Sequence, residues 1–267
     1  FQGGIMQLKT PNFRLHIIRG ILLFITNACF FCALVTMPIA EATTLFYISP
    51  LLITFLSVII LGEKVGFRRI LALVVGLFGV LLASWSNIYQ NSDYSSDFTF
   101  ILPLVAALAY ALMQVLTRHL GVTAPAAVMA IYIQGILIII SFFFWVALGD
   151  GRYSSELNTA SVEFLLRAWS FPKGNDGLLL LGCGLTSAII GYSMAQAYRV
   201  SNPAIIAPFE YIALPLSIMW GWLVWSELPV MLAWFGIILI SGAGFYTFFR
   251  ENQKGYEVAL KQFLRRW

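Results

Sequence analysis

The chain alternates long apolar runs with short polar joints. Each run is about 20 residues long, the length that an α-helix needs to cross the hydrocarbon core of a bilayer. Strands of a membrane barrel would instead alternate apolar and polar side chains over about ten residues, and no such alternation is present. The pattern predicts eight membrane-spanning helices, at 15–37, 42–61, 70–89, 98–117, 125–148, 177–198, 203–225 and 230–249.

Composition agrees with this pattern. The chain has 267 residues, of which 60% are hydrophobic and 10% charged, whereas a soluble domain usually carries about 25% charged residues. The predicted fold class is therefore an all-α, polytopic membrane helix bundle, with 1–267 as a single transmembrane domain. The net charge is +4, but the basic residues lie mainly in the joints, where they act as topology signals. Nucleic acid is therefore not an expected partner.

The placement of lysine and arginine predicts the orientation of the chain. With the N-terminal segment in the cytoplasm, 13 of the 16 basic residues lie on the cytoplasmic side. Segment 250–267 is then a basic cytoplasmic tail, and the expected location is the inner membrane of a prokaryote. The other three basic residues share the long outer loop 149–176. Apolar residues at helical spacing in this loop predict a short helix on the outer membrane surface, with Val162, Leu165, Leu166 and Trp169 as its apolar positions.

A weak internal repeat is visible when the chain is compared with itself at a separation of 164 residues. Identical residues recur at Ala40 and Ala204, Tyr47 and Tyr211, Ile48 and Ile212, Leu52 and Leu216, and Glu63 and Glu227. The predicted topology places Glu63 inside and Glu227 outside. The two copies would therefore cross the membrane in opposite directions, which is typical of inverted-repeat transporters.

The repeat predicts two unequal halves. Residues 15–89 form an incomplete first copy and residues 98–249 a second copy, in which three spans precede the matching helix where the first copy has one. We therefore expect eight helices of a ten-helix protein here, with two N-terminal helices absent from this chain.

Three segments resemble the EamA group of the drug/metabolite transporter superfamily. They are LHIIRGILLF at 15–24, MPIAEATTLFYISPLLITFLSVIILGEKVGFRR at 37–69, and MAQAYRVSNPAIIAPFEYIALPLSIMWGWLVWSE at 194–227. The resemblance extends from about residue 13 to 250. It implies two inverted five-helix halves, a central cavity and alternating access. Members of this group move amino acids, nucleosides, vitamins such as riboflavin, S-adenosylmethionine or toxic analogues, so a small molecule of one of these classes is the expected substrate.

Glu210 is the sharpest candidate for chemistry. It lies within the predicted span 203–225, where an ionised side chain facing lipid would cost about 3 kcal/mol or more. It is therefore expected to face the protein interior or water, where it would bind a cationic group of the substrate or exchange a proton. The alternative is a structural hydrogen bond made by a protonated acid.

Tyrosines accompany this acid in both copies of the repeat. Tyr47 maps onto Tyr211, which follows Glu210 directly, and tyrosine suits an amphipathic or ring-containing metabolite. Tyr47 also belongs to a predicted polar face on the span 42–61, which runs through Thr43, Tyr47, Pro50, Thr54 and Ser57. The alternative is that these hydroxyls satisfy themselves on the preceding helical turn.

Five further residues complete the predicted substrate site. Tyr110 and Gln114 share a helical face, and Tyr192 and Gln196 are neighbours one turn apart. Gln196 has the alternative of an exposed polar cap. Asn27 is an amide within the first span, and such amides also serve to bond another helix.

Several functions are excluded or disfavoured by absent motifs. There is no G-x-x-x-x-G-K-[ST] loop for ATP, and no metal-spaced cluster or hydrolytic motif. We therefore expect no cofactor, no metal and no enzymatic activity. The predicted function is secondary transport of a small organic metabolite. The alternatives are a flippase for lipids or lipid-linked sugars, and a membrane protein without transport. A homodimer is left open.

Overall fold

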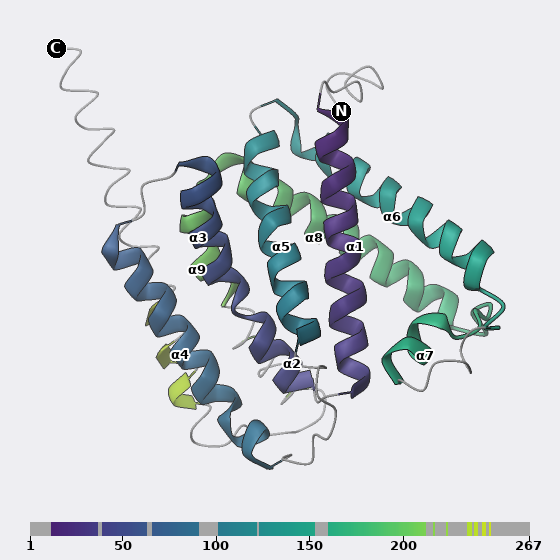
Figure 1. The fold of residues 1–267 in the computed structure, drawn as a ribbon, viewed down its shortest axis with the longest axis horizontal. Helices are drawn as coiled ribbons and strands as arrows, with labels where there is room; N and C mark the ends of the chain where they lie inside the picture. The colour runs from purple at the N-terminus through teal and green to yellow at the C-terminus, as the bar shows by residue number, and fades with distance from the viewer. Residues whose placement is uncertain are drawn as a thin grey trace. The chain divides into compact units, whose positions relative to one another are not determined.

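The computed structural model describes residues 12–36, 39–62, 66–90, 101–121, 123–152 and 160–211, together with positions 216, 223, 234–236, 238–239, 242–243 and 246. Most of these residues are helical, the rest form turns and joints, and none of them is in a strand. Figure 1 shows the helices, which are α1 (Phe13–Thr36), α2 (Ile39–Phe46), α3 (Ser49–Leu61), α4 (Phe67–Gln90), α5 (Ile101–Leu120), α6 (Ala126–Leu148), α7 (Ala160–Leu166), α8 (Asp176–Val200) and α9 (Pro203–Glu210).

The chain divides into two compact units, and each takes segments from both parts of the sequence. Unit 1 contains Phe1–Phe46 and Ser95–Asn202, and unit 2 contains Tyr47–Tyr94 and Pro203–Trp267. The chain therefore passes from one unit to the other directly after α2 and directly before α9.

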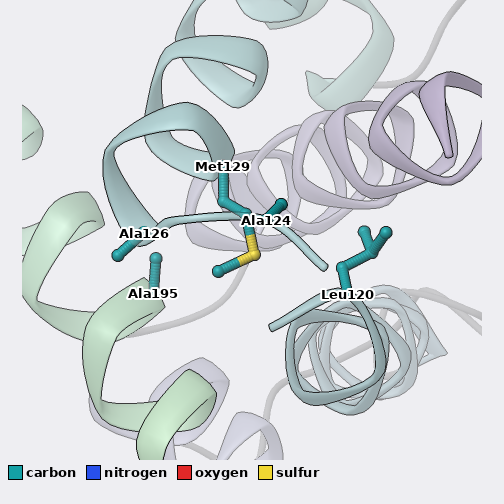
Figure 2. Close-up of a cluster of buried hydrophobic side chains, with 5 residues drawn as sticks. All are labelled: Leu120, Ala124, Ala126, Met129 and Ala195. Atoms are coloured by element: carbon teal, nitrogen blue, oxygen red, sulfur yellow. The ribbon is translucent and has the colours of Figure 1, made fainter. Parts of the chain in front are cut away.

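In unit 1, α1 packs most extensively against α5 and also contacts α6 and α7, while α8 packs against α5 and α6. The helix ends meet at a small apolar cluster, which Figure 2 shows with its members Leu120, Ala124, Ala126, Met129 and Ala195. Three of the five are alanines, so the ends of α5 and α8 and the start of α6 approach closely. This packing of small side chains is typical of membrane bundles.

Arginines fasten the ends of α5 and α8 in unit 1. Arg118 donates from Nη1 to the carbonyl oxygen of Arg199 at 2.6 Å, and from Nη2 to Oδ1 of Asn202 at 3.3 Å. Arg199 in turn donates from Nε to the carbonyl oxygen of Gly121 at 3.1 Å. A Cβ at Gly121 would lie 2.9 Å from the Cα of Arg199, so glycine allows the two helix ends to come this close.

In unit 2, α9 packs against α3 and α4, which also contact each other. α3 begins with Pro50 in its first turn, where a missing N–H costs no helical bond. It ends at Gly62, whose φ of 66° is the left-handed conformation that glycine adopts without strain. The same cap bonds the N–H of Gly62 to the carbonyl of Ser57.

The predicted helices are largely confirmed, with one correction. Four described helices are long and apolar enough to cross a membrane: Phe13–Thr36, Ile101–Leu120, Ala126–Leu148 and Asp176–Val200. They match predicted spans, and α4 matches the span 70–89. The short helix predicted within 149–176 is present as α7. The span 230–249, most of 203–225, the tail 250–267 and both Glu63 and Glu227 lie largely or wholly outside the described residues.

The correction concerns the predicted continuous helix 42–61. It is broken, because α2 ends at Phe46 and α3 begins at Ser49. Pro50 explains the break: it has no N–H to donate to the carbonyl of Phe46 four residues earlier, and its ring would clash with that carbonyl. The polar face predicted from Thr43 to Ser57 therefore does not exist as a single helical face.

Candidate functional site

The end of α2 has a counterpart at the end of α9. α2 ends at Phe46 and Tyr47 follows in a turn, while α9 ends at Glu210 and Tyr211 follows in a turn. The bounds of α9, Pro203–Glu210, lie 164 residues after those of α2, Ile39–Phe46. The structure therefore repeats a local feature at the same separation as the sequence. Broken helices are where inverted-repeat transporters place their substrate sites.

The two repeat-related tyrosines meet in unit 2. Their ring centroids are 6.0 Å apart with an interplanar angle of 48°. Both side chains are buried, Tyr211 completely. Aromatic pairs at this distance contribute about 0.5–1.5 kcal/mol beyond their buried area. The pair predicted from the repeat is thus in contact.

A glycine on α4 makes room for the Tyr211 ring. A Cβ at Gly76 would lie 2.5 Å and 2.6 Å from two ring carbons of Tyr211, closer than any side-chain carbon can approach. The ring therefore packs directly on the backbone of α4. Sequence analysis did not predict this role, because it depends on packing between segments far apart in the chain.

Two buried hydroxyls in unit 2 have unused hydrogen-bonding capacity. Among the described residues, neither the phenolic oxygen of Tyr211 nor Oγ of Ser49 has a hydrogen-bond partner. An unsatisfied buried polar group is costly, and such groups are rare in native structures. Ser49 was not predicted; its position directly after the break between α2 and α3 was the signal that could have identified it.

Glu210 lies next to this pair. It is the last residue of α9, it directly precedes Tyr211, and its side chain is half-buried. The structure therefore brings Tyr47, Glu210 and Tyr211 together in unit 2. Their role in substrate binding stays a prediction.

The hydroxyls of α3 bond carbonyls of their own helix, which is the alternative to a role in the substrate site. Oγ1 of Thr54 donates to the carbonyl of Pro50 at 3.0 Å, and Oγ of Ser57 donates to the carbonyl of Thr54 at 2.8 Å. Both side chains are buried. Thr54 and Ser57 are thus satisfied by their own helix, so they are poor candidates for substrate contacts.

The remaining five predicted residues lie on helices of unit 1. On α5, Gln114 is buried, with 2% of its surface exposed. One turn earlier, Tyr110 is half-buried, and its ring centroid lies 5.5 Å from that of Phe46 of α2. The aromatic residue that ends α2 therefore packs on a predicted site residue.

The other three positions are more open. Asn27 is exposed on α1, while the hydroxyl of its neighbour Thr26 donates to the carbonyl of Leu22 at 2.8 Å and lies 3.4 Å from the carbonyl of Ala106 on α5. On α8, Tyr192 is 49% exposed and Gln196 is half-buried. Because these five residues belong to unit 1, one site that combines all eight predicted residues stays a prediction.

Metal chemistry finds no support in the described part of the chain. No group of three or more His, Cys, Asp or Glu residues there could hold a metal ion. Cys29, Cys32 and Cys183 are free cysteines, and Sγ of Cys32 donates to the carbonyl of Ser161 at 3.5 Å, a contact between α1 and α7.

The fold and the site define a class: a multi-pass helical membrane protein with aromatic and acidic side chains at a helix break. Residues 1–85 match the EamA-like transporter family. A riboflavin transporter of Brucella anthropi is 29% identical over 94% of this chain and 82% of its own length. An S-adenosylmethionine uptake transporter of Rickettsia felis is 22% identical over 95% of this chain and 78% of its own length.

A solved crystal structure has the same fold. It matches with a TM-score of 0.70 and 18% sequence identity, over 90% of this chain and 77% of the other. The predicted resemblance is thus confirmed: residues 1–85 match the EamA-like transporter family, and nearly the whole chain is similar to proteins named as transporters of riboflavin or S-adenosylmethionine.

Proposed function

We propose that the chain is a secondary carrier that moves a small organic metabolite across the membrane by alternating access. The named activities of its relatives support transport rather than catalysis. The observation that carries the proposal is the contact between Tyr47 and Tyr211 beside Glu210, where each tyrosine directly follows the end of a repeated helix.

The site favours a metabolite that contains a flat ring and polar groups. Two tyrosine rings offer an apolar surface on which a ring packs, and the hydroxyls of Tyr211 and Ser49 offer hydrogen bonds that no described residue takes up. Glu210 would bind a cationic group or exchange a proton. Riboflavin and S-adenosylmethionine, which relatives carry, both contain a ring system and polar groups, so they are the first substrates to test.

We further propose the cytoplasmic membrane as the location, with the C-terminal segment in the cytoplasm. The support is the bias of basic residues toward one side of the predicted spans. Within that topology, the segments 15–89 and 98–249 would cross the membrane in opposite directions.

Counterflow in liposomes tests the proposal. Purified chain is reconstituted with unlabelled riboflavin or S-adenosylmethionine inside, and uptake of the labelled compound is followed from outside. We expect transient accumulation of at least one of the two above protein-free liposomes. No accumulation with either compound, or with a panel of amino acids and nucleosides, would contradict metabolite transport.

Two further measurements separate the alternatives. Scrambling of a fluorescent phospholipid without counterflow would favour a flippase, and neither activity would favour a protein without transport. Glu210→Gln then tests the acid: if counterflow of the substrate is unchanged from pH 5 to pH 8, Glu210 neither binds charge nor exchanges a proton. Glu163→Gln, an exposed acid on α7, is the matched control and should leave counterflow unchanged.

A further inference from the structure

His16 and Arg19 form a second concentration of buried polar groups, in unit 1. They lie three residues apart on α1, and therefore on the same side of the helix. Arg19 is 1% exposed and His16 is 0% exposed. Neither residue belongs to the predicted substrate site, and both stand within an apolar helix that is long enough to cross a membrane.

Their hydrogen bonds are incomplete. Nε of Arg19 donates to Oγ1 of Thr117 at 3.1 Å, and that hydroxyl donates onward to the carbonyl of Met113 at 2.8 Å. Within the described structure, Nη1 of Arg19 and both ring nitrogens of His16 are buried without a partner. The imidazole is stacked on the ring of Tyr132, with centroids 4.5 Å apart. Three buried nitrogen atoms therefore have no hydrogen-bond partner among the described residues.

Other arginines of the same unit show what a structural arginine does here. Arg118 and Arg199 both direct their guanidinium groups onto backbone carbonyls at the ends of α5 and α8. Arg19 is more deeply buried than either, yet no hydrogen bond from it to a carbonyl or carboxylate is found among the described contacts. Joining helices therefore accounts for Arg118 and Arg199, whereas for Arg19 it accounts only for the Nε bond to Thr117 and leaves the buried Nη1 unexplained.

The local charge is positive. Two more arginines lie in this region, Arg14 near the start of α1 and Arg118 near the end of α5. The acids of unit 1 whose side chains are described lie elsewhere: Asp150 just after the end of α6, Glu163 on α7, and Asp176 at the start of α8. An unpaired cation buried in a membrane segment is expensive, and such residues mark binding sites or pathways. The missing partner is therefore an anion.

We propose that Arg19 and His16 bind an anionic oxygen group, a phosphate or a carboxylate, in unit 1. The guanidinium would donate from Nη1 while Nε keeps its bond to Thr117, and the imidazole would donate from one ring nitrogen. Hydrogen bonds from arginine to such groups are about twice as strong as neutral ones. The group belongs either to a soluble metabolite or to the headgroup of an anionic lipid. Because the three nitrogens are covered, entry requires the groups around them, including the Tyr132 ring, to move.

Ligand-dependent thermal unfolding tests this site without a transport assay. The chain is placed in nanodiscs of phosphatidylcholine, and the unfolding midpoint is measured with inorganic phosphate or acetate against chloride at equal ionic strength. A second arm replaces part of the lipid with phosphatidylglycerol. A ligand that binds the folded state raises the midpoint. We expect a rise with phosphate or acetate if the source is soluble, and with phosphatidylglycerol if it is lipid.

Variants show whether the effect belongs to Arg19. Arg19→Gln should raise the dissociation constant of the active anion at least tenfold, whereas Arg14→Gln, at an exposed arginine five residues earlier on α1, should leave it unchanged. Arg19→Lys keeps the charge without the planar fork, and it should fold and bind more weakly than the unmodified chain. An equal response of the unmodified chain and Arg19→Gln in both arms would overturn the proposal.

The unmodified chain provides a test that needs no variant. If neither phosphate, acetate nor phosphatidylglycerol raises its unfolding midpoint, the anion site is refuted even when Arg19→Gln does not fold. Because the readout is binding, a failure of metabolite counterflow would leave this result standing, and the two proposals are judged separately.

Discussion

At the scale of single residues, Tyr211 allows its contribution to packing to be tested separately from its contribution to substrate binding. Its ring is buried against Tyr47 and the backbone of α4, but its hydroxyl makes no described hydrogen bond. Removing an unsatisfied hydroxyl from a buried site costs little stability. We therefore expect Tyr211→Phe to leave the unfolding midpoint unchanged or slightly raised. If the hydroxyl bonds the substrate, the dissociation constant should rise about threefold to tenfold, as for the loss of one hydrogen bond.

Equilibrium binding of the substrate identified by counterflow, measured beside thermal unfolding, checks this expectation. Tyr246→Phe is the control, since Tyr246 is an exposed tyrosine at 47% of its surface. A lower midpoint with unchanged affinity for Tyr211→Phe would show that the hydroxyl is structural.

Gly76 contacts the same ring through the backbone of α4. An alanine there would place Cβ about 2.5 Å from the ring carbons of Tyr211, so the ring must shift. Such overpacking costs about 1–3 kcal/mol. We expect Gly76→Ala to weaken substrate binding at least tenfold and to lower the unfolding midpoint by a few degrees. Gly184→Ala, where no atom lies within 4 Å of the added Cβ, should change neither quantity.

These residues show how far the sequence could predict the site. Tyr47, Glu210 and Tyr211 could be predicted because a charge in an apolar run is costly and the repeat relates the two tyrosines. Ser49 and Gly76 could not be predicted from the same signals. Serine is common in membrane helices, and the need for glycine at position 76 arises only when α9 packs on α4.

At the scale of elements, hydropathy predicted the positions of helices but not their interruptions. The spans at α1, α4, α5, α6 and α8 follow from apolar length alone. The break between α2 and α3 does not, because a hydropathy average measures the cost of transfer into lipid and is insensitive to one missing N–H. The helical spacing of polar residues places Pro50 on a predicted polar face, whereas in the structure Pro50 ends the preceding helix.

Pro50 should therefore control the break. Pro50→Ala restores an N–H that can donate to the carbonyl of Phe46, so α2 and α3 could join into one helix. We expect a higher unfolding midpoint together with a clear loss of counterflow, because a continuous helix would displace Tyr47.

The control for this change is another proline. Pro103 is the third residue of α5, where an N–H would have no helical partner. Pro103→Ala should leave counterflow and the midpoint nearly unchanged. If Pro50→Ala also leaves counterflow unchanged, the break is not needed for transport.

At the scale of the whole molecule, the contacts do not follow the order of the sequence. Each compact unit combines an early and a late segment, and the chain changes unit after Phe46 and before Pro203. These are opposite ends of the two repeated helices, the C-terminal end of α2 and the N-terminal end of α9. Residue patterns along the chain cannot reveal such an exchange, because it depends on which helix faces find each other after the spans have formed.

Cysteine labelling can test whether the two repeat copies cross the membrane in opposite directions. In a background with alanine at Cys29, Cys32 and Cys183, single cysteines replace Lys64 and Leu228, which follow the two repeat glutamates. A membrane-impermeant maleimide applied to intact cells should label Leu228→Cys, and label Lys64→Cys only after permeabilisation. Arg152→Cys, in the predicted outer loop, is the control for outside labelling. Labelling of both repeat positions from the same side would mean that the copies run in the same direction, and the predicted topology would then be wrong.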